Sequence, residues 1–146
     1  CLGDIYSNAP AGSSKSLENP FKSTGNTIVD LGDDVFTRGK PHPMIDPTPR
    51  NGRLIQEMAD PTCGVLLLDV VLGYGSHEDP AGELAAAIAK GKAATANPPI
   101  CIASVCGTDQ DPQHLDVQCA KLEAQGVVLC QSNAQAAALA ACVLMA

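Results

Sequence analysis

The chain has 146 residues, a length that suits one domain with a single sizeable core. Its 16 acidic residues outnumber 9 basic ones, and the net charge of -7 disfavours nucleic acid and anionic membranes as partners. Hydrophobic residues make up 45% of the chain, so it is not disordered as a whole. It has no apolar run of the roughly 20 residues that a membrane helix needs, and its first residues lack the basic and apolar regions of a signal peptide.

The cysteine pattern favours reduced thiols. The chain contains seven cysteines, an odd number, and no two of them form a Cys-x-x-Cys pair. This spacing fits neither a disulfide framework nor a zinc site. We therefore expect no metal centre and a cytoplasmic protein.

Residues 1–26 are rich in Ser, Asn, Gly and Pro, and we expect an irregular leader or the remnant of an upstream segment. The start at Cys1 suggests a processed chain or a fragment. Regular patterns begin at residue 27 and define a domain over 27–146. Four predicted strands alternate with four predicted helices, at 27–31, 50–59, 63–72, 82–96, 100–106, 112–125, 127–130 and 133–145.

The predicted strands are almost continuously apolar, which indicates that both faces of their sheet are buried. We expect a three-layer α/β fold with a parallel sheet of about four to five strands and helices on both faces. Asp-Pro pairs stand before three of the helices, at residues 46–47, 79–80 and 111–112. Each Asp is a candidate N-cap followed by a proline that has no N–H to lose, whereas Asp60-Pro61 ends a helix.

Ligands of parallel sheets bind beyond the carboxyl ends of the strands, which directs attention to the loops there. Gly73-Tyr74-Gly75-Ser76 follows a strand and is either a tight turn or a loop whose amides approach an anion. It is neither a P-loop nor a dinucleotide fingerprint. In the long loop over residues 32–46, two prolines flank His42, which is either a functional or a packed side chain.

Four other sites have a functional and a structural interpretation, and we favour the structural one. Asp33 and Asp34 could hold magnesium, although capping or turn chemistry is the commoner role of Gly-Asp-Asp. His77 and His114 lie near helix starts, where exposed polar residues are routine. Cys106 ends a strand and is either a reactive or a buried thiol.

Several segments resemble the second domain of the succinyl-CoA synthetase alpha subunit, and more closely the FdrA branch of acyl-CoA synthetase-like proteins. The shared wording covers about residues 27–141: Asp-Leu-Gly-Asp-Asp, Pro-His-Pro-Met-Ile-Asp-Pro, Leu-Asp-Val-Val-Leu-Gly-Tyr-Gly, Asp-Pro-Ala-Gly and Ser-Val-Cys-Gly-Thr. The resemblance implies a flavodoxin-like domain of the CoA-ligase type. CoA, a nucleotide and Mg are cofactors by this resemblance only.

Two departures from the family qualify the resemblance. The phosphohistidine loop Gly-His-Ala-Gly is absent, and its place holds residues 108–114. The strand and Gly-Gly-Thr loop that open the family domain are also missing, and by the family pattern that strand lies inside the sheet. We therefore expect another chain, an upstream part of the protein or residues 1–26 to fill a gap, because unpaired backbone groups in a sheet interior destabilise it.

The resemblance implies an enzyme that handles an acyl or carbamoyl phosphate, in acyl-CoA ligation or in oxamate carbamoyl transfer of allantoin and purine catabolism. Partners would be the upstream part of the protein or another subunit, in an oligomer acting on a small anionic substrate. The alternative is a non-catalytic assembly domain, suggested by a last helix that is apolar almost all round. The candidate catalytic residues are His42 and Asp46, and the candidate substrate- or phosphate-binding residues are Arg38, Lys40, Gly73, Tyr74, Gly75, Ser76, Gly107 and Thr108, with Arg50 as a further nearby cation.

Overall fold

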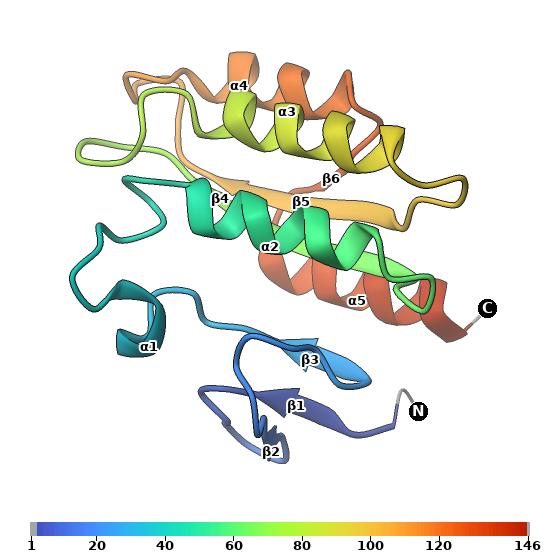
Figure 1. Ribbon diagram of the computed structural model, residues 1–146. Helices are drawn as coiled ribbons and strands as arrows, with labels where there is room; N and C mark the ends of the chain where they lie inside the picture. The colour runs from blue at the N-terminus through green and yellow to red at the C-terminus, as the bar shows by residue number, and fades with distance from the viewer. Residues whose placement is uncertain (1–2, 146) are drawn as a thin grey trace.

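The computed structural model describes residues 3–145, which form two parallel sheets with helices packed around the larger one (Figure 1). The small sheet has the strand order β2-β1-β3 and the large one the order β4-β5-β6. The strands are β1 (Ile5–Ser7), β2 (Lys15–Ser16), β3 (Asn26–Ile28), β4 (Val65–Val71), β5 (Ile100–Cys106) and β6 (Val128–Cys130). The helices are α1 (Asp34–Thr37), α2 (Thr48–Met58), α3 (Pro80–Ala93), α4 (Leu115–Glu123) and α5 (Asn133–Met145).

The large sheet has a core on each face, because successive side chains of β5 point to opposite sides. Cys101 and Ala103 pack with the buried residues of α2, α3 and α4 in the main cluster. Ile102 points the other way and packs against Ala136 and Ala140 of α5. This division confirms the predicted α/β fold with parallel strands between helical layers.

The large sheet has two edge strands, β4 and β6, because β5 pairs with β4 on one side and with β6 on the other. Among the described residues no strand pairs with the other side of β4. The side chains of Leu67 and Val71 on this strand are exposed. The large sheet therefore has three strands, fewer than the four to five that we expected.

We expected an irregular leader before residue 27, but residues 3–26 contain the short strands β1 and β2. These strands have only three and two residues, too short for a hydrophobic period. In the expected strand over 27–31, only Thr27 and Ile28 belong to β3, where they pair with Tyr6 and Ser7 of β1.

A largely but not fully buried ion pair links α2 to residues 17–25, which connect β2 to β3. Arg53 pairs with Glu57 one turn later and donates to Pro20 O at 2.9 Å and to Ser23 Oγ at 2.7 Å. Ser23 donates in turn to Glu57 at 2.7 Å. These contacts explain how a chain segment with little core of its own is held beside the domain.

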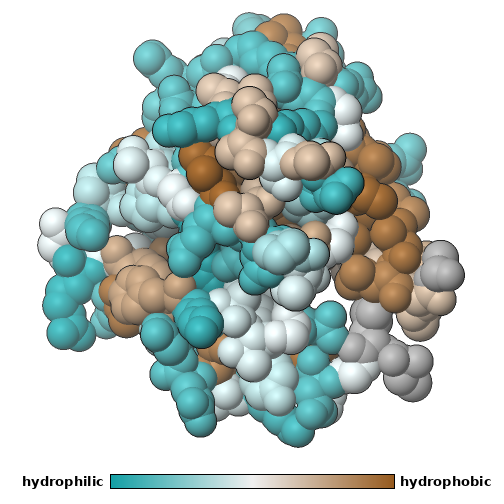
Figure 2. Space-filling model, turned by 45° about the vertical axis from the view of Figure 1, so that its right-hand side comes forward, coloured by the Kyte–Doolittle hydropathy of each residue, from teal (hydrophilic) through white to brown (hydrophobic). Residues whose placement is uncertain are grey.

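One face of α5 is unpartnered within the described chain. Ala136 and Ala140 are buried, whereas Leu144 and Met145 at its end are exposed. Figure 2 shows hydrophobic surface on its right-hand side, toward which the C-terminal end of the chain lies in Figure 1. No helix of the described chain has both the length and the apolar character to cross a bilayer.

Candidate functional site

The candidate site lies at the carboxyl ends of the large sheet's strands, where three loops meet. Residues 72–79 follow β4, residues 107–114 follow β5, and residues 38–47 lead into α2. Figure 1 shows these loops together at its left-hand side, opposite the chain ends. The His77 amide donates to Met44 O at 2.7 Å, so the first and third loops are in direct contact.

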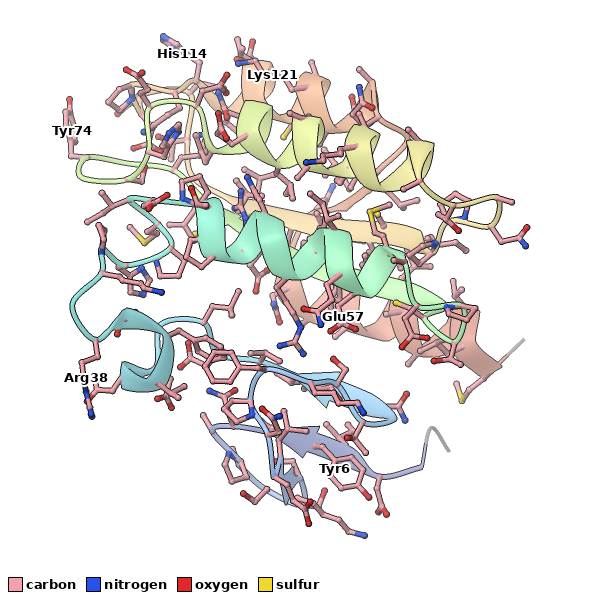
Figure 3. All side chains as sticks on the ribbon, in the orientation of Figure 1. Tyr6, Arg38, Glu57, Tyr74, His114 and Lys121 are labelled. Atoms are coloured by element: carbon pink, nitrogen blue, oxygen red, sulfur yellow. The ribbon has the colours of Figure 1, made fainter. Side chains whose placement is uncertain are left out.

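The loop over residues 73–77 depends on its two glycines. Gly73 has a φ of 126° and Gly75 a φ of 85°, values that side-chain-bearing residues rarely adopt. The Ser76 hydroxyl closes the turn by donating to Gly73 O at 2.8 Å. Tyr74 between the glycines is 89% exposed, and Figure 3 shows it pointing outward from the tip of the loop. Within the described chain, the structure records no hydrogen bond from the amides of Tyr74 and Gly75.

The side chain of Gln113, in the loop after β5, holds the 73–77 loop by hydrogen bonds. This residue was not identified from the sequence. The residue is 6% exposed, although it lies in the loop before α4. Its Oε1 accepts from Gly73 N at 3.1 Å, while its Nε2 lies 3.1 Å from Gly73 O, 3.0 Å from Ser76 Oγ and 3.0 Å from His77 O. A glutamine in a polar loop belongs to no hydrophobic period. The one sequence feature that points to it is its position in a loop after the carboxyl end of a predicted strand.

Asp79 caps α3 as the Asp-Pro pattern predicts, and two further side chains from α4 hold it. Its Oδ1 accepts from Gly82 N at 3.0 Å, from Gln118 Nε2 at 3.1 Å and from Lys121 Nζ at 2.7 Å. Partial burial acts to raise the pKa of Asp79, but the hydrogen bonds from Lys121, Gly82 and Gln118 outweigh it and the net pKa is lowered.

The other two Asp-Pro pairs do not cap their helices in the predicted way. The N-cap position of α2 is Pro47 and that of α4 is His114. Asp46 instead accepts from Thr48 N at 3.0 Å, and Asp111 accepts from Thr108 N at 2.7 Å. Each carboxylate forms a local turn before its helix, a role that Asp plays as readily as capping.

His42 and Asp46 lie in one turn, but their side chains have different neighbours. The His42 Nδ1 accepts from Met44 N at 3.1 Å, and its ring lies so close to Gly32 that an added Cβ there would come within 2.6 Å of Nε2. Hydrogen bonds from Thr48 lower the pKa of Asp46, and the neighbouring His77 acts in the same direction. The structure thus joins Asp46 to Thr48 at the start of α2 and places His42 beside the turn that follows β3.

The predicted cations do not converge on the 73–77 loop. Arg38 lies next to Asp33, Asp34 and Val35 in an open hollow, and Figure 3 shows its side chain pointing away from the protein. Lys40 is exposed. Arg50 is largely occupied inside the fold, because its Nη2 donates to Pro80 O at 3.3 Å and to Asn51 Oδ1 at 3.1 Å. Burial lowers the pKa of Arg50.

Gly107 and Thr108 have structural roles. An added Cβ at Gly107 would come within 2.7 Å of Leu72 Cβ, so the close approach of the chain after β5 to β4 requires glycine. The Thr108 amide donates to the Asp111 carboxylate. His114 nearby has a φ of 58°, the one positive value among the described residues other than glycine.

Of the remaining candidates, Asp33 has the capping role that we favoured, whereas Cys106 is exposed and not the buried thiol that we expected. Asp33 caps α1, accepting from Val35 N at 3.0 Å. No group of three or more metal-ligating side chains is found among residues 3–145. The six cysteines in this part of the chain are free thiols. Burial raises the pKa of Cys63 to about 11 and also raises the pKa values of Cys101 and Cys119, while Cys106 is exposed at the end of β5.

Comparison with known proteins places this arrangement in a family. The CoA-ligase family profile matches residues 4–143, and so includes most of the segment that we expected to precede the domain. The chain is 45% identical over 141 residues to the uncharacterized protein YahF of Escherichia coli strain K12. That alignment covers 94% of this chain and 27% of YahF, so the chain spans about a quarter of its relative. The chain belongs to the CoA-ligase family.

Proposed function

We propose that this chain is the CoA-ligase-like part of an FdrA-type enzyme that handles an acyl or carbamoyl phosphate at the 73–77 loop. The observation that carries the proposal is the fixed conformation of this loop, held by Met44 on one side and Gln113 on the other. The Tyr74 and Gly75 amides at its tip are suited to phosphate oxygens, because backbone N–H groups in a glycine turn can surround an anion. Membership of the CoA-ligase family supports the coarser part of the proposal, a CoA-ligase-like domain.

In this proposal His77 contacts the bound anion, while Asp46 and His42 lie in the neighbouring loop over residues 38–47, which His77 N joins through Met44 O. The His77 Nδ1 accepts from Asp79 N at 3.0 Å, which leaves the Nε2 side of the ring to donate to a phosphoryl oxygen. Arg38 and Lys40 lie on the surface away from the 73–77 loop and act on the anion only as long-range positive charges. The chemistry is transfer of the acyl or carbamoyl group from phosphate to an acceptor, with oxamate as the acceptor in the carbamoyl case.

The test uses the longest form of the protein that can be prepared, with acetyl phosphate and carbamoyl phosphate as probes in calorimetry. The His77→Leu variant has no side-chain donor and should bind both probes at least about tenfold more weakly, since a hydrogen bond to a charged group contributes about 1.5–3 kcal/mol. His114→Leu serves as the matched control, because it removes an exposed histidine in the neighbouring loop. Absence of binding by the unaltered protein would contradict the proposal.

The second candidate is an assembly domain within a larger enzyme. The free edge of β4 and the exposed end of α5 favour it, because an unpaired strand and apolar residues are what a partner subunit would cover. The partner would be another part of the same protein or another subunit, in a cytoplasmic oligomer. Sedimentation of the chain alone tests it: a dimer that does not respond to phosphate, CoA or oxamate favours assembly over catalysis.

A further inference from the structure

Gln113 is a buried loop residue whose side chain forms several hydrogen bonds to another loop. Its carboxamide uses both ends, one as an acceptor for the Gly73 amide and the other as a donor toward Gly73 O, Ser76 Oγ and His77 O. All of these partners belong to the 73–77 loop, some 40 residues away in the chain. A buried amide with its hydrogen-bonding groups satisfied on a single loop restricts the conformations of that loop.

The backbone around Gln113 supports the same role. His114 directly after it has a φ of 58°, which is strained for a residue with a side chain. The His114 amide donates to Asp111 O at 2.9 Å, which forms the turn that directs Gln113 inward. The carbonyl of Gln113 also accepts from Gln118 Nε2 at 3.3 Å, but this long bond reaches the backbone and leaves the bonds of the Gln113 carboxamide to residues 73–77 independent of Gln118.

We propose that Gln113 is a positioning residue, which holds the 73–77 loop in the conformation that presents the Tyr74 and Gly75 amides and His77 to a phosphate-bearing ligand. This inference rests on the proposed function for the identity of the ligand, but not for the effect on the loop. Without the brace, Gly73 and Gly75 make the loop free to sample other conformations. Ligand affinity then falls by the fraction of molecules that retain the bound conformation.

The experiment compares Gln113→Met with Gln118→Met. Both variants replace a buried glutamine with an apolar side chain of similar length, but the Gln118 side chain has no hydrogen bond to residues 73–77, since its partners are Ala81 N, Asp79 Oδ1 and Gln113 O. Amide hydrogen exchange at Gly73 should accelerate about tenfold or more in Gln113→Met relative to Gln118→Met. The dissociation constant for inorganic phosphate should rise about fivefold or more in the first variant and less than about twofold in the second.

The outcomes separate the two proposals. If the unaltered protein does not bind phosphate, the proposed function fails, while the exchange rate of Gly73 still decides the role of Gln113. Unchanged exchange at Gly73, or an equal loss of phosphate affinity in the two variants, would overturn the positioning role. Should Gln113→Met not fold, Gln113→Asn decides instead, because it keeps the neutral amide but is one methylene too short to span the same partners.

Discussion

Asp79 concentrates three hydrogen bonds on one carboxylate oxygen, and its effect on stability depends on pH. Because its folded-state pKa is lowered, its contribution is present above the unfolded-state pKa and is lost as the pH falls through the folded value. Asp79→Ala should lower the free energy of unfolding at pH 7 by about 1 kcal/mol, the usual cost of losing an N-cap. Urea denaturation at pH 7 and pH 3 checks this: the difference between the variant and the unaltered protein should shrink at pH 3. A difference that stays constant between the two pH values would contradict the role of the ionised carboxylate.

Gly107 shows how a residue that looks functional in the sequence can be required by packing. Gly107→Ala would bring a Cβ within 2.7 Å of Leu72 Cβ, so we expect an overpacking cost of about 1–3 kcal/mol. Gly52→Ala is the matched control, because Gly52 lies inside α2 with nothing within 4 Å of an added Cβ. That control should stabilise the protein by about 0.5–1 kcal/mol. Equal urea midpoints for the two variants would refute the packing explanation.

At the scale of elements, the sequence predicted the large sheet well and the small one poorly. The predicted strand over 100–106 and the predicted helix over 133–145 match β5 and α5 residue for residue, because each is a long apolar run between clear breaks. By contrast, β1 and β2 are short, and polar residues such as Lys15 and Ser16 form much of them. Pairing of such strands depends on contacts distant in the chain, which no local pattern contains.

In the candidate site too, the features set by local sequence could be predicted, whereas the long-range contacts could not. The glycine loop and the Asp79 cap could be predicted, because turn and cap residues have local preferences. Gly73 is bonded to Gln113, and Asp79 to Gln118 and Lys121, which come from other segments of the chain. These long-range partners, Gln113 above all, could be found only in the structure.

Arg53 of α2 holds residues 17–25, the segment between β2 and β3, against the helix. Arg53→Met should leave Glu57 without its cation in a mostly buried position, and we expect a loss of roughly 3 kcal/mol in the free energy of unfolding. The segment over residues 17–25 should also become more susceptible to limited proteolysis, since Pro20 O and Ser23 lose their donor. Arg38→Met is the control, because the Arg38 side chain is exposed. Proteolysis at the same rate in both variants would show that other contacts hold the segment.

At the scale of the whole molecule, the edge of β4 that no described strand covers is a surface on which another strand could pair. The bonds from Ile100 N to Gly64 O and from Leu72 N to Cys106 O bracket the β4–β5 ladder. In a parallel ladder alternate residues bond to the same neighbour. The backbone N–H and C=O groups of the even-numbered residues of β4 therefore point toward β5. The amides of the odd-numbered residues, Val65, Leu67, Asp69 and Val71, point toward the uncovered edge.

This alternation predicts a pattern of amide hydrogen exchange along one strand. In the isolated chain, the amides of Leu67 and Asp69 should exchange about tenfold or more faster than those of Leu66 and Leu68, because only the latter pair has ladder partners. The even-numbered amides serve as the internal control for global unfolding. Equal protection of both sets would mean that something covers the edge. If that protection disappears on dilution, a second copy of the chain covers it; if it persists, a strand within the chain does. A partner from the rest of a longer protein should protect Leu67 and Asp69 when it is added, since a new strand would bond to the groups that β5 leaves free.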